Sequence, residues 1–254
     1  MSAASDLRHS QIIEFLKEYD QAKVVELSNQ FKVTEETIRR DLDRLEEEGL
    51  VIRKHGAAVL RENYSHESSF DERSIKNIEE KRSIAKEAIK YIKTGDRIYL
   101  DGSTTAWQMS RFIQDMEITV ITNSLKVVSN LIHHEKMKVI CLGGEVIRTL
   151  QTVSGLVPMN LLREYHLDKC FISCQGLDAE WGVSDNNEDV VALKKIALKQ
   201  SKVYYLLVDR FKIHQKSSFL IAPTEKIEYL ITNQMENKDL AAKYKSKISN
   251  FIEV

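Results

Sequence analysis

Basic side chains that could contact nucleic acid are grouped between residues 34 and 58 of this 254-residue chain. Two adjacent arginines, Arg39 and Arg40, are followed by Arg44, and a second basic run, Arg53-Lys54-His55, lies further along. Guanidinium groups can form two parallel hydrogen bonds with phosphate oxygens or with the edge of a guanine base. The spacing therefore predicts a DNA-reading surface made from one helix and one basic turn.

A helix beginning after Thr34 would present the first set of arginines. Thr34 is a favourable N-cap because its hydroxyl can accept from an unpaired backbone N–H, and Gly49 suits a left-handed helix end. Apolar residues recur on one side at Ile38, Leu42 and Leu45. At about 100° per residue, the opposite side carries Glu36, Arg40, Asp43 and Glu47, with Thr37 and Arg44 beside them and Arg39 on the flank.

Helical segments at 7–18 and 23–31 precede this helix, and a tight turn at 32–33 leads into it. Two short strands, 50–52 and 57–60, flank the basic turn. This order predicts a winged helix-turn-helix domain over residues 1–60, whose last helix reads the major groove. The predicted DNA-binding residues are Thr34, Glu36, Thr37, Arg39, Arg40 and Arg44 on the helix and Arg53, Lys54 and His55 on the wing. We expect Thr37 and Arg40 to contact bases or phosphates, and the wing to contact mainly the DNA backbone.

Net charge by itself does not indicate nucleic acid. The chain has 37 basic and 38 acidic residues, and residues 1–60 hold nine basic against twelve acidic residues, a net of −3. A solvated helix face with pairs four residues apart, such as Arg40 with Glu36 or Arg44 with Glu48, is the alternative explanation of the basic set. The order of helices and turn favours the DNA-reading interpretation.

Polar or glycine residues follow five successive strand-like segments in the rest of the chain. These strand-end loops are Asp101-Gly102-Ser103-Thr104-Thr105, Thr122-Asn123-Ser124, Gly143-Gly144, Gln175-Gly176-Leu177-Asp178 and Asp209-Arg210-Phe211-Lys212. Small residues let backbone N–H groups approach an anion, hydroxyls add donors, and a helix N-terminus favours negative charge. Ordinary capping would explain each loop alone, but it does not require five of them to converge. The loops predict a phosphate-binding pocket, with Lys212 as its cation.

The elements that would position these loops alternate between strand and helix. Strand-like segments lie at 97–100, 118–121, 138–142, 170–173, 203–208 and 227–231, and helical segments at 81–92, 106–113, 125–132 and 189–199. The pattern predicts an α/β domain with a parallel sheet covered on both faces, which binds ligands at the carboxyl ends of its strands. Residues 61–75 are polar and lack periodicity, so we expect a linker between domain 1–60 and domain 76–254.

Several classes of protein are disfavoured by composition. Apolar runs near 20 residues and a signal peptide are not found in the sequence, so we expect a soluble, cytoplasmic protein without a membrane partner. The three cysteines, Cys141, Cys170 and Cys174, lie in apolar segments and are predicted to be buried, reduced thiols. C-x3-C without a matching histidine pair is a weak metal signal, so neither a metal nor another cofactor is expected.

Residues 7–60 resemble the DNA-binding domain of DeoR-type bacterial regulators, whose pattern runs V-S-x-x-T-I-R-R-D-L, then L-x-x-x-G and R-x-H-G-G-A. Here residues 33–42 read VTEETIRRDL, Leu45 and Gly49 follow, and residues 53–58 read RKHGAA. The chain departs from the pattern at Thr34, which replaces serine as a cap, and at Ala57, where the family usually has glycine.

Residues 75–254 resemble the effector-binding half of the same family, which shows D-x-G-T-T, T-N-S, L-G-G, G-x-D and D-x-x-K at the five loops. That resemblance implies a fold related to ribose-5-phosphate isomerase and a phosphorylated sugar or polyol as effector. The implied effector-binding residues are Asp101, Gly102, Ser103, Thr104, Thr105, Asn123, Ser124, Gly143, Gly144, Gly176, Asp178 and Lys212. Before Lys194-Lys195 the family often has glutamate, where this chain has Val190, Val191 and Ala192.

The resemblance favours a transcriptional repressor that binds double-stranded operator DNA as a dimer or tetramer, because two-fold operator sites need at least two readers. Effector binding would shift the linker and misplace the readers. Two alternatives remain. The second domain could only oligomerise, or it could be an isomerase-like enzyme with Asp178 or Glu180 as base. A partnered glutamate and lysine loop of the isomerase kind is not found in the sequence, so no catalytic residue is predicted.

Overall fold

The computed structural model describes residues 3–19, 21–54, 57–60 and 69–254. The chain divides into two compact units, Met1–His66 and Glu67–Val254. His55, predicted for the wing, and residues 61–68 of the expected linker lie outside the described residues.

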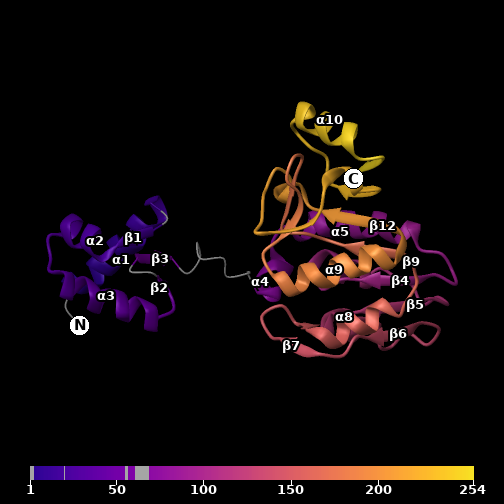
Figure 1. Ribbon diagram of the computed structural model, residues 1–254, viewed down its shortest axis with the longest axis horizontal. Coiled ribbons are helices and arrows are strands. Elements are labelled where there is room, and N and C mark those ends of the chain that lie inside the picture. Colours follow the sequence, from indigo (N-terminus) through magenta and orange to yellow (C-terminus); the bar gives the residue numbers. More distant parts are fainter. Residues whose placement is uncertain (1–2, 20, 55–56, 61–68) are drawn as a thin grey trace. The chain divides into compact units, whose positions relative to one another are not determined.

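The first unit is a helical bundle closed by a small antiparallel sheet of order β1-β3-β2. Its elements are α1 (Ala3–Tyr19), β1 (Gln21–Lys23), α2 (Val24–Phe31), α3 (Glu35–Glu47), β2 (Val51–Lys54) and β3 (Ala57–Leu60) (Figure 1). The predicted helices and wing strands are present. Strand β1 was not predicted, because three residues with only Ala22 buried are too short to show a period of two.

Helix α3 starts and ends where its sequence signals predict. The Thr34 side chain accepts a hydrogen bond from the Thr37 backbone N–H, and Gly49 just beyond the helix has φ of 74°. The apolar stripe formed by Ile38, Leu42 and Leu45 is fully or almost fully buried in the core of this unit. The opposite face of α3 is therefore left to solvent.

A buried acid ties α1 to α3 within this core. Asp41 is 5% exposed, and its carboxylate accepts hydrogen bonds from the guanidinium group of Arg8, with Nη2 at 3.0 Å. Its other partner is the His9 ring, with Nε2 3.1 Å from Oδ1. The hydrogen bond with Asp41 raises the pKa of Arg8, against a smaller opposing effect of burial. This ionic contact therefore joins two helices of the first unit that are not adjacent along the chain.

We expect Asp41→Asn to destabilise the first unit by about 1–3 kcal/mol, because it removes the charge from a buried, hydrogen-bonded pair. Amide hydrogen exchange of α3 measures the change separately from the second unit. Asp43→Asn on the same helix is the control, since the Asp43 carboxylate is exposed and its pair with Arg53 should contribute little. Equal protection of α3 in the two variants would contradict a structural role for Asp41.

The second unit is built on a seven-stranded parallel sheet of order β15-β14-β12-β9-β4-β5-β6. Its strands are β4 (Arg97–Leu100), β5 (Thr119–Thr122), β6 (Lys138–Cys141), β9 (Leu167–Ile172), β12 (Ser201–Val208), β14 (Tyr229–Thr232) and β15 (Asn250–Glu253). From β4 the chain builds outward through β5 and β6, then returns to place β9 on the other side of β4. The order of the sheet therefore reverses between β4 and β9.

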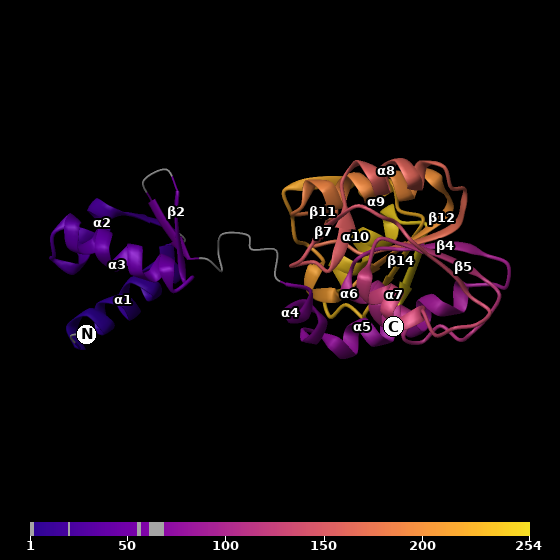
Figure 2. The ribbon, with the colours of Figure 1, turned by 90° about the horizontal axis from the view of Figure 1, so that it is seen from below.

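Helices cover both faces of this sheet, as predicted (Figure 2). One face packs against α5 (Ile78–Ala88), α6 (Thr104–Ser110) and α7 (Leu125–Leu131), and the other against α8 (Leu156–Arg163), α9 (Glu188–Gln200) and α10 (Lys238–Lys247). Along β4, Ile98 and Leu100 join the first apolar core and Tyr99 the second, which is the alternation a doubly covered strand requires. None of the helices in the described part of the chain is long and apolar enough to cross a membrane.

Smaller elements complete the second unit. Two antiparallel sheets are formed by β7 (Glu145–Ile147) with β8 (Thr152–Ser154), and by β10 (Gly176–Asp178), β11 (Gly182–Asp185) and β13 (Phe219–Ala222). Single 3-10 turns lie at η1 (Ile89–Tyr91), η2 (Arg210–Lys212) and η3 (Thr224–Lys226).

Two expectations need correction. Helix α4 (Phe70–Ile75) lies in the last part of the expected linker, where Ser69 caps it through a reciprocal hydrogen-bonded box with Glu72. Cys141, expected to be buried, is exposed because β6 is an edge strand of the sheet. Cys170 and Cys174 are buried free thiols as predicted, and burial raises the pKa of Cys174 to about 12.

Candidate functional site

The exposed face of α3 carries the predicted reading residues as a row of ion pairs. Arg40 has 79% of its side chain exposed, with Nε 3.5 Å from Glu36 Oε1. Arg39 pairs with Glu35 at 2.9 Å, and Arg44 lies 3.5 Å from Glu48. Exposed pairs of this kind contribute little to stability, so the guanidinium groups can exchange a carboxylate for a phosphate or a base edge.

The other predicted DNA-binding residues lie beside this row. The Thr34 and Thr37 hydroxyls are 2.9 Å apart at the helix start. In the wing, Arg53 forms an ion pair with Asp43 of α3, and its backbone N–H donates to the Glu46 carboxylate at 3.1 Å. Lys54 closes strand β2. The Arg53 contacts hold strand β2 of the wing against α3. The residues predicted to contact DNA on the helix and on the wing are therefore linked.

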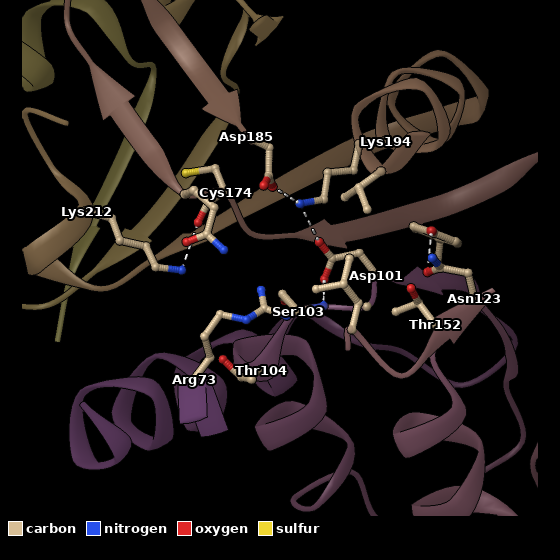
Figure 3. Close-up of a pocket in the computed structure, with 15 residues that line it drawn as sticks. Arg73, Asp101, Ser103, Thr104, Asn123, Thr152, Cys174, Asp185, Lys194 and Lys212 are labelled. Atoms are coloured by element: carbon tan, nitrogen blue, oxygen red, sulfur yellow. Dashed lines mark hydrogen bonds and ion pairs between the residues drawn. The ribbon is translucent and has the colours of Figure 1, made fainter. Parts of the chain in front are cut away.

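In the second unit, a pocket opens at the carboxyl ends of the central strands, where the order of the sheet reverses (Figure 3). Parallel α/β sheets bind ligands at this topological position because the loops after neighbouring strands diverge there. We call it the strand-end pocket; its lining is Arg73, Tyr99, Asp101, Gly102, Ser103, Thr104, Asn123, Leu150, Thr152, Cys174, Gln175, Asp185, Val190, Lys194 and Lys212.

A buried lysine lies on one wall of the strand-end pocket. Lys194 of α9 donates from Nζ to the Asp185 carboxylate at 2.7 Å and to the Ser173 carbonyl at 2.8 Å, and Asp101 lies 3.4 Å away. Burial alone would lower the pKa of Lys194, but the negative charges of Asp185 and Asp101 outweigh it and raise that pKa above its ordinary value. The group is therefore a permanent cation that links three segments of the chain.

Asp101 organises the loop after β4. Its Oδ1 accepts from the Ser103 backbone N–H and its Oδ2 from the Ser173 backbone N–H, both at 3.0 Å. The Ser103 hydroxyl in turn caps α6 by accepting from the Ala106 N–H at 3.1 Å. Gly102 is required between them, because a Cβ there would lie 2.2 Å from Cγ2 of Thr152.

Neutral polar groups form the opposite wall. Asn123 accepts from the Tyr99 hydroxyl at 2.9 Å and donates to the Val153 carbonyl at 3.3 Å, so its amide is fixed. Thr152 is 2% exposed, and its hydroxyl has no hydrogen-bond partner among the residues that the structure describes. Together with the carboxylates, this wall offers the donors and acceptors that hydroxyl groups of a ligand would need.

Cations lie at the rim of the pocket. Lys212 donates from Nζ to the Cys174 carbonyl at 2.8 Å, and Arg73 reaches the rim from α4 (Figure 3). Within the described ranges, no three histidine, cysteine or acidic side chains are grouped as a metal ion would require.

The structure brings together half of the predicted effector residues and gives the others different surroundings. Asp101, Gly102, Ser103, Thr104, Asn123 and Lys212 line the pocket; Thr105, Ser124, Gly143, Gly144, Gly176 and Asp178 do not. Ser124 caps α7, and a Cβ at Gly144 or Gly176 would lie within 2.6 Å of a backbone oxygen. The Asp178 carboxylate accepts from the Glu180 and Trp181 N–H groups in the turn after β10.

Several pocket residues were missed, chiefly Arg73, Thr152, Asp185 and Lys194. Lys194 could have been found from the sequence, because it is spaced three residues from both Val191 and Ala197 and so lies on the buried side of α9. A lysine on that side needs acidic partners. Arg73 was assigned to the linker. Thr152 and Asp185 belong to strands of three and four residues, and Asp185 pairs with Phe219, which is distant in sequence.

These features define a class of protein. An exposed reading helix with its wing, joined in one chain to a parallel α/β unit with a strand-end pocket, is the architecture of a DNA-binding transcriptional regulator. Family models agree for both halves: the DeoR-like helix-turn-helix domain matches residues 8–63 and the DeoR C terminal sensor domain matches residues 76–234. The chain belongs to the DeoR family.

Individual relatives support this assignment. The chain is 42% identical to the HTH-type transcriptional regulator YulB of Bacillus subtilis, covering 89% of this chain and 88% of that protein. It is 36% identical to the HTH-type transcriptional regulator GolR of Listeria innocua, covering 93% and 94%. Among solved structures, ribose 5-phosphate isomerase A of Methanocaldococcus jannaschii matches with a TM-score of 0.41 at 19% identity, covering 59% of this chain and 58% of the isomerase.

Lys194→Met should lower the free energy of unfolding of the second unit by about 3–5 kcal/mol, because it leaves two buried carboxylates without their cation. Urea unfolding followed by circular dichroism measures the loss. Lys195→Met is the matched control, since that neighbouring side chain is exposed and its replacement should stay within about 0.5 kcal/mol. Equal midpoints for the two variants would show that Lys194 does not hold the site together.

Proposed function

We propose that this regulator represses a sugar or polyol utilisation operon and leaves its operator when a phosphorylated sugar binds the second unit. The observation that carries the proposal is the strand-end pocket, in which hydroxyl-binding groups and cations meet at one edge of the sheet. One relative of 30% identity, the L-fucose operon activator of Haemophilus influenzae, is named for a sugar operon, and another of 30% identity, GlcR of Bacillus subtilis, is named as a transcriptional repressor. The direction of regulation, repression, is our inference.

The DNA-binding half of the proposal depends on α3 and the wing. Arg40 is the most exposed of the paired arginines on α3, and Thr37 lies one turn before it on the same side. We assign base or phosphate contacts to these two residues and backbone contacts to Arg53, Lys54 and His55. Two-fold operators require at least a dimer of this chain.

Effector recognition would divide the pocket by chemistry. The carboxylates, the Asn123 amide and the Thr152 hydroxyl would form hydrogen bonds with the hydroxyl groups of the sugar. Arg73 and Lys212 would attract its phosphate. An enzyme is less well supported, because neither acid considered as its base lines the pocket. Asp178 accepts hydrogen bonds from the turn after β10, and Glu180 pairs with Lys243 and Lys247.

The coupling between the two functions would pass through α4. This helix is the first described element after the wing, and its Arg73 lines the pocket. A ligand that contacts Arg73 favours one arrangement of α4, and hence of the chain that leads to the reader. If the effector binds more tightly to the arrangement of α4 that disfavours operator binding, it lowers the affinity of the protein for the operator.

Replacement of Arg40 by alanine should weaken operator binding by about 1–3 kcal/mol, the usual effect of losing a base contact. Fluorescence anisotropy at fixed salt with DNA flanking the gene provides the measurement. Arg163→Ala, which removes an exposed arginine from α8, is the control for the change in charge. Unchanged affinity of the Arg40 variant would remove Arg40 from the DNA interface.

The regulatory half is tested with the same operator complex and a panel of sugar and polyol phosphates, each paired with its unphosphorylated form. We expect one phosphate ester to release the DNA and its parent sugar to be without effect, because the rim cations need an anion. Tight operator binding that no compound alters, together with no shift in melting temperature, would favour a second unit that only oligomerises. Turnover of a compound by the free protein would favour the enzyme.

A further inference from the structure

A second, larger cavity adjoins the strand-end pocket and shares Arg73, Gln175 and Lys212 with it. We call it the cationic cavity; its lining is Arg73, Lys76, Asn77, Lys81, Gln175, Asn186, Asp209, Phe211, Lys212, Gln215, Lys216 and Ser217. Its volume is about 340 Å³, whereas the strand-end pocket has about 20 Å³, room for roughly one water molecule. The cationic cavity is therefore the part of the site with room for most of a ligand.

The lining of this cavity is strongly biased in charge. Five side chains are basic, coming from α4, from the residue that follows it, from α5 and from the segment after β12: Arg73, Lys76, Lys81, Lys212 and Lys216. Asp209 is the single acid among its lining residues. Asp209 is 1% exposed, and its Oδ2 lies 3.9 Å from Lys212 Nζ. Asp178, outside the lining, lies 3.7 Å from Lys216 Nζ, so the five cations still exceed these two acids.

Some N–H groups of these cations have no hydrogen-bond acceptor among the residues that the structure describes. Lys81 is 3% exposed and donates from Nζ to the carbonyls of Arg73 and Lys76, the latter at 2.6 Å, which leaves the third ammonium hydrogen. The Nε atom of Arg73 is buried and has no acceptor among the residues that the structure describes. Buried N–H groups of this kind are suited to the oxygens of an anion.

The pKa of Lys81 is lowered by its burial and by the positive charges around it. Burial, and to a smaller extent the charge of Lys212, lower the pKa of Lys81 to about 8, whereas Asp209 opposes the shift. The charges of Arg73 in α4 and of Lys76 just after it act in the same direction as Lys212. An anion placed among these groups would favour the protonated amine.

We propose that the cationic cavity binds the phosphoryl group of the effector, and that the strand-end pocket, with room for about one hydroxyl group, receives only a terminal hydroxyl of it. This assignment deepens the proposed function and rests on it for the identity of the ligand, but the phosphoryl site itself stands on the geometry of the cavity. The phosphate would contact cations from α4, from α5 and from the segment after β12. The anion would thereby draw α4 toward the rest of the unit.

Inorganic phosphate is the probe for this subsite, titrated calorimetrically into the full-length protein at constant ionic strength with chloride as the reference salt. The test variant is Lys76→Gln combined with Lys216→Gln, because both side chains are exposed and neither supports the core. The control is Lys90→Gln combined with Lys202→Gln, which removes two exposed lysines that each pair with one acid elsewhere. We expect phosphate binding to weaken about tenfold or more in the test variant, and to be unchanged in the control.

A pH profile gives a second, independent readout. Below pH 8 the protonated Lys81 attracts the phosphate dianion, and as the pH rises through about 8 the amine loses its charge. Phosphate affinity of the wild type should therefore fall between pH 8 and 9.5, a range in which inorganic phosphate is already almost entirely the dianion. A flat profile together with equal binding by the test and control variants would overturn the subsite.

The outcomes separate the subsite from the proposed function. Release of the operator by a sugar phosphate that is equally effective on the Lys76/Lys216 variant would refute the subsite and leave the regulator as proposed. Phosphate binding that is lost in this variant, with no sugar phosphate able to release the operator, would establish the subsite and refute the proposed effector class.

Discussion

The second unit depends on one buried ammonium group. Lys194 binds the Ser173 carbonyl after β9 and the Asp185 carboxylate at the end of β11, and it faces Asp101 after β4. A lysine that is 5% exposed is tolerated only when acids and carbonyls surround it. The loops on both sides of the reversal in strand order are thereby fixed relative to α9. The shape of the strand-end pocket follows from this arrangement.

Helix α4 depends in turn on the pocket that it borders. Six residues are too few to form a stable helix alone, so contacts with the rest of the unit must hold it. The Phe70 N–H donates to the Thr149 carbonyl at 2.7 Å, and the Phe70 ring packs edge-on against Trp107. Lys81 closes the other end by binding two of its last carbonyls. A ligand beside Arg73 and Lys81 would add to these contacts.

Much of this architecture could be predicted from the sequence. The reading helix was predicted in detail, because its cap, its apolar stripe and its terminal glycine are all local signals. The parallel sheet followed from apolar strands that alternate with helices. Strand β1 and the strands of the two small antiparallel sheets were missed, since most of them have only three or four residues and too short a pattern to be told from turns.

The lining of the strand-end pocket was predicted only where polar residues come directly after a strand. Asp101 and Asn123 were found this way, but half of the strand-end residues serve as caps or tight turns instead. Arg73 was missed because α4 is polar and short. The basic residues of the cationic cavity come from segments more than 100 residues apart, and no local pattern reports that they meet.

The acidic partners on the reading helix have a consequence for how this protein would move among DNA sites. Arg39, Arg40 and Arg44 each carry a glutamate nearby, and residues 1–60 are negative overall. Attraction to any phosphate backbone is what holds most DNA-binding proteins on random sequence. A reader that supplies its own counter-ions would be held there only weakly. A larger fraction of its molecules would then be free to find the operator, because genomic competition is set by the ratio of specific to non-specific affinity.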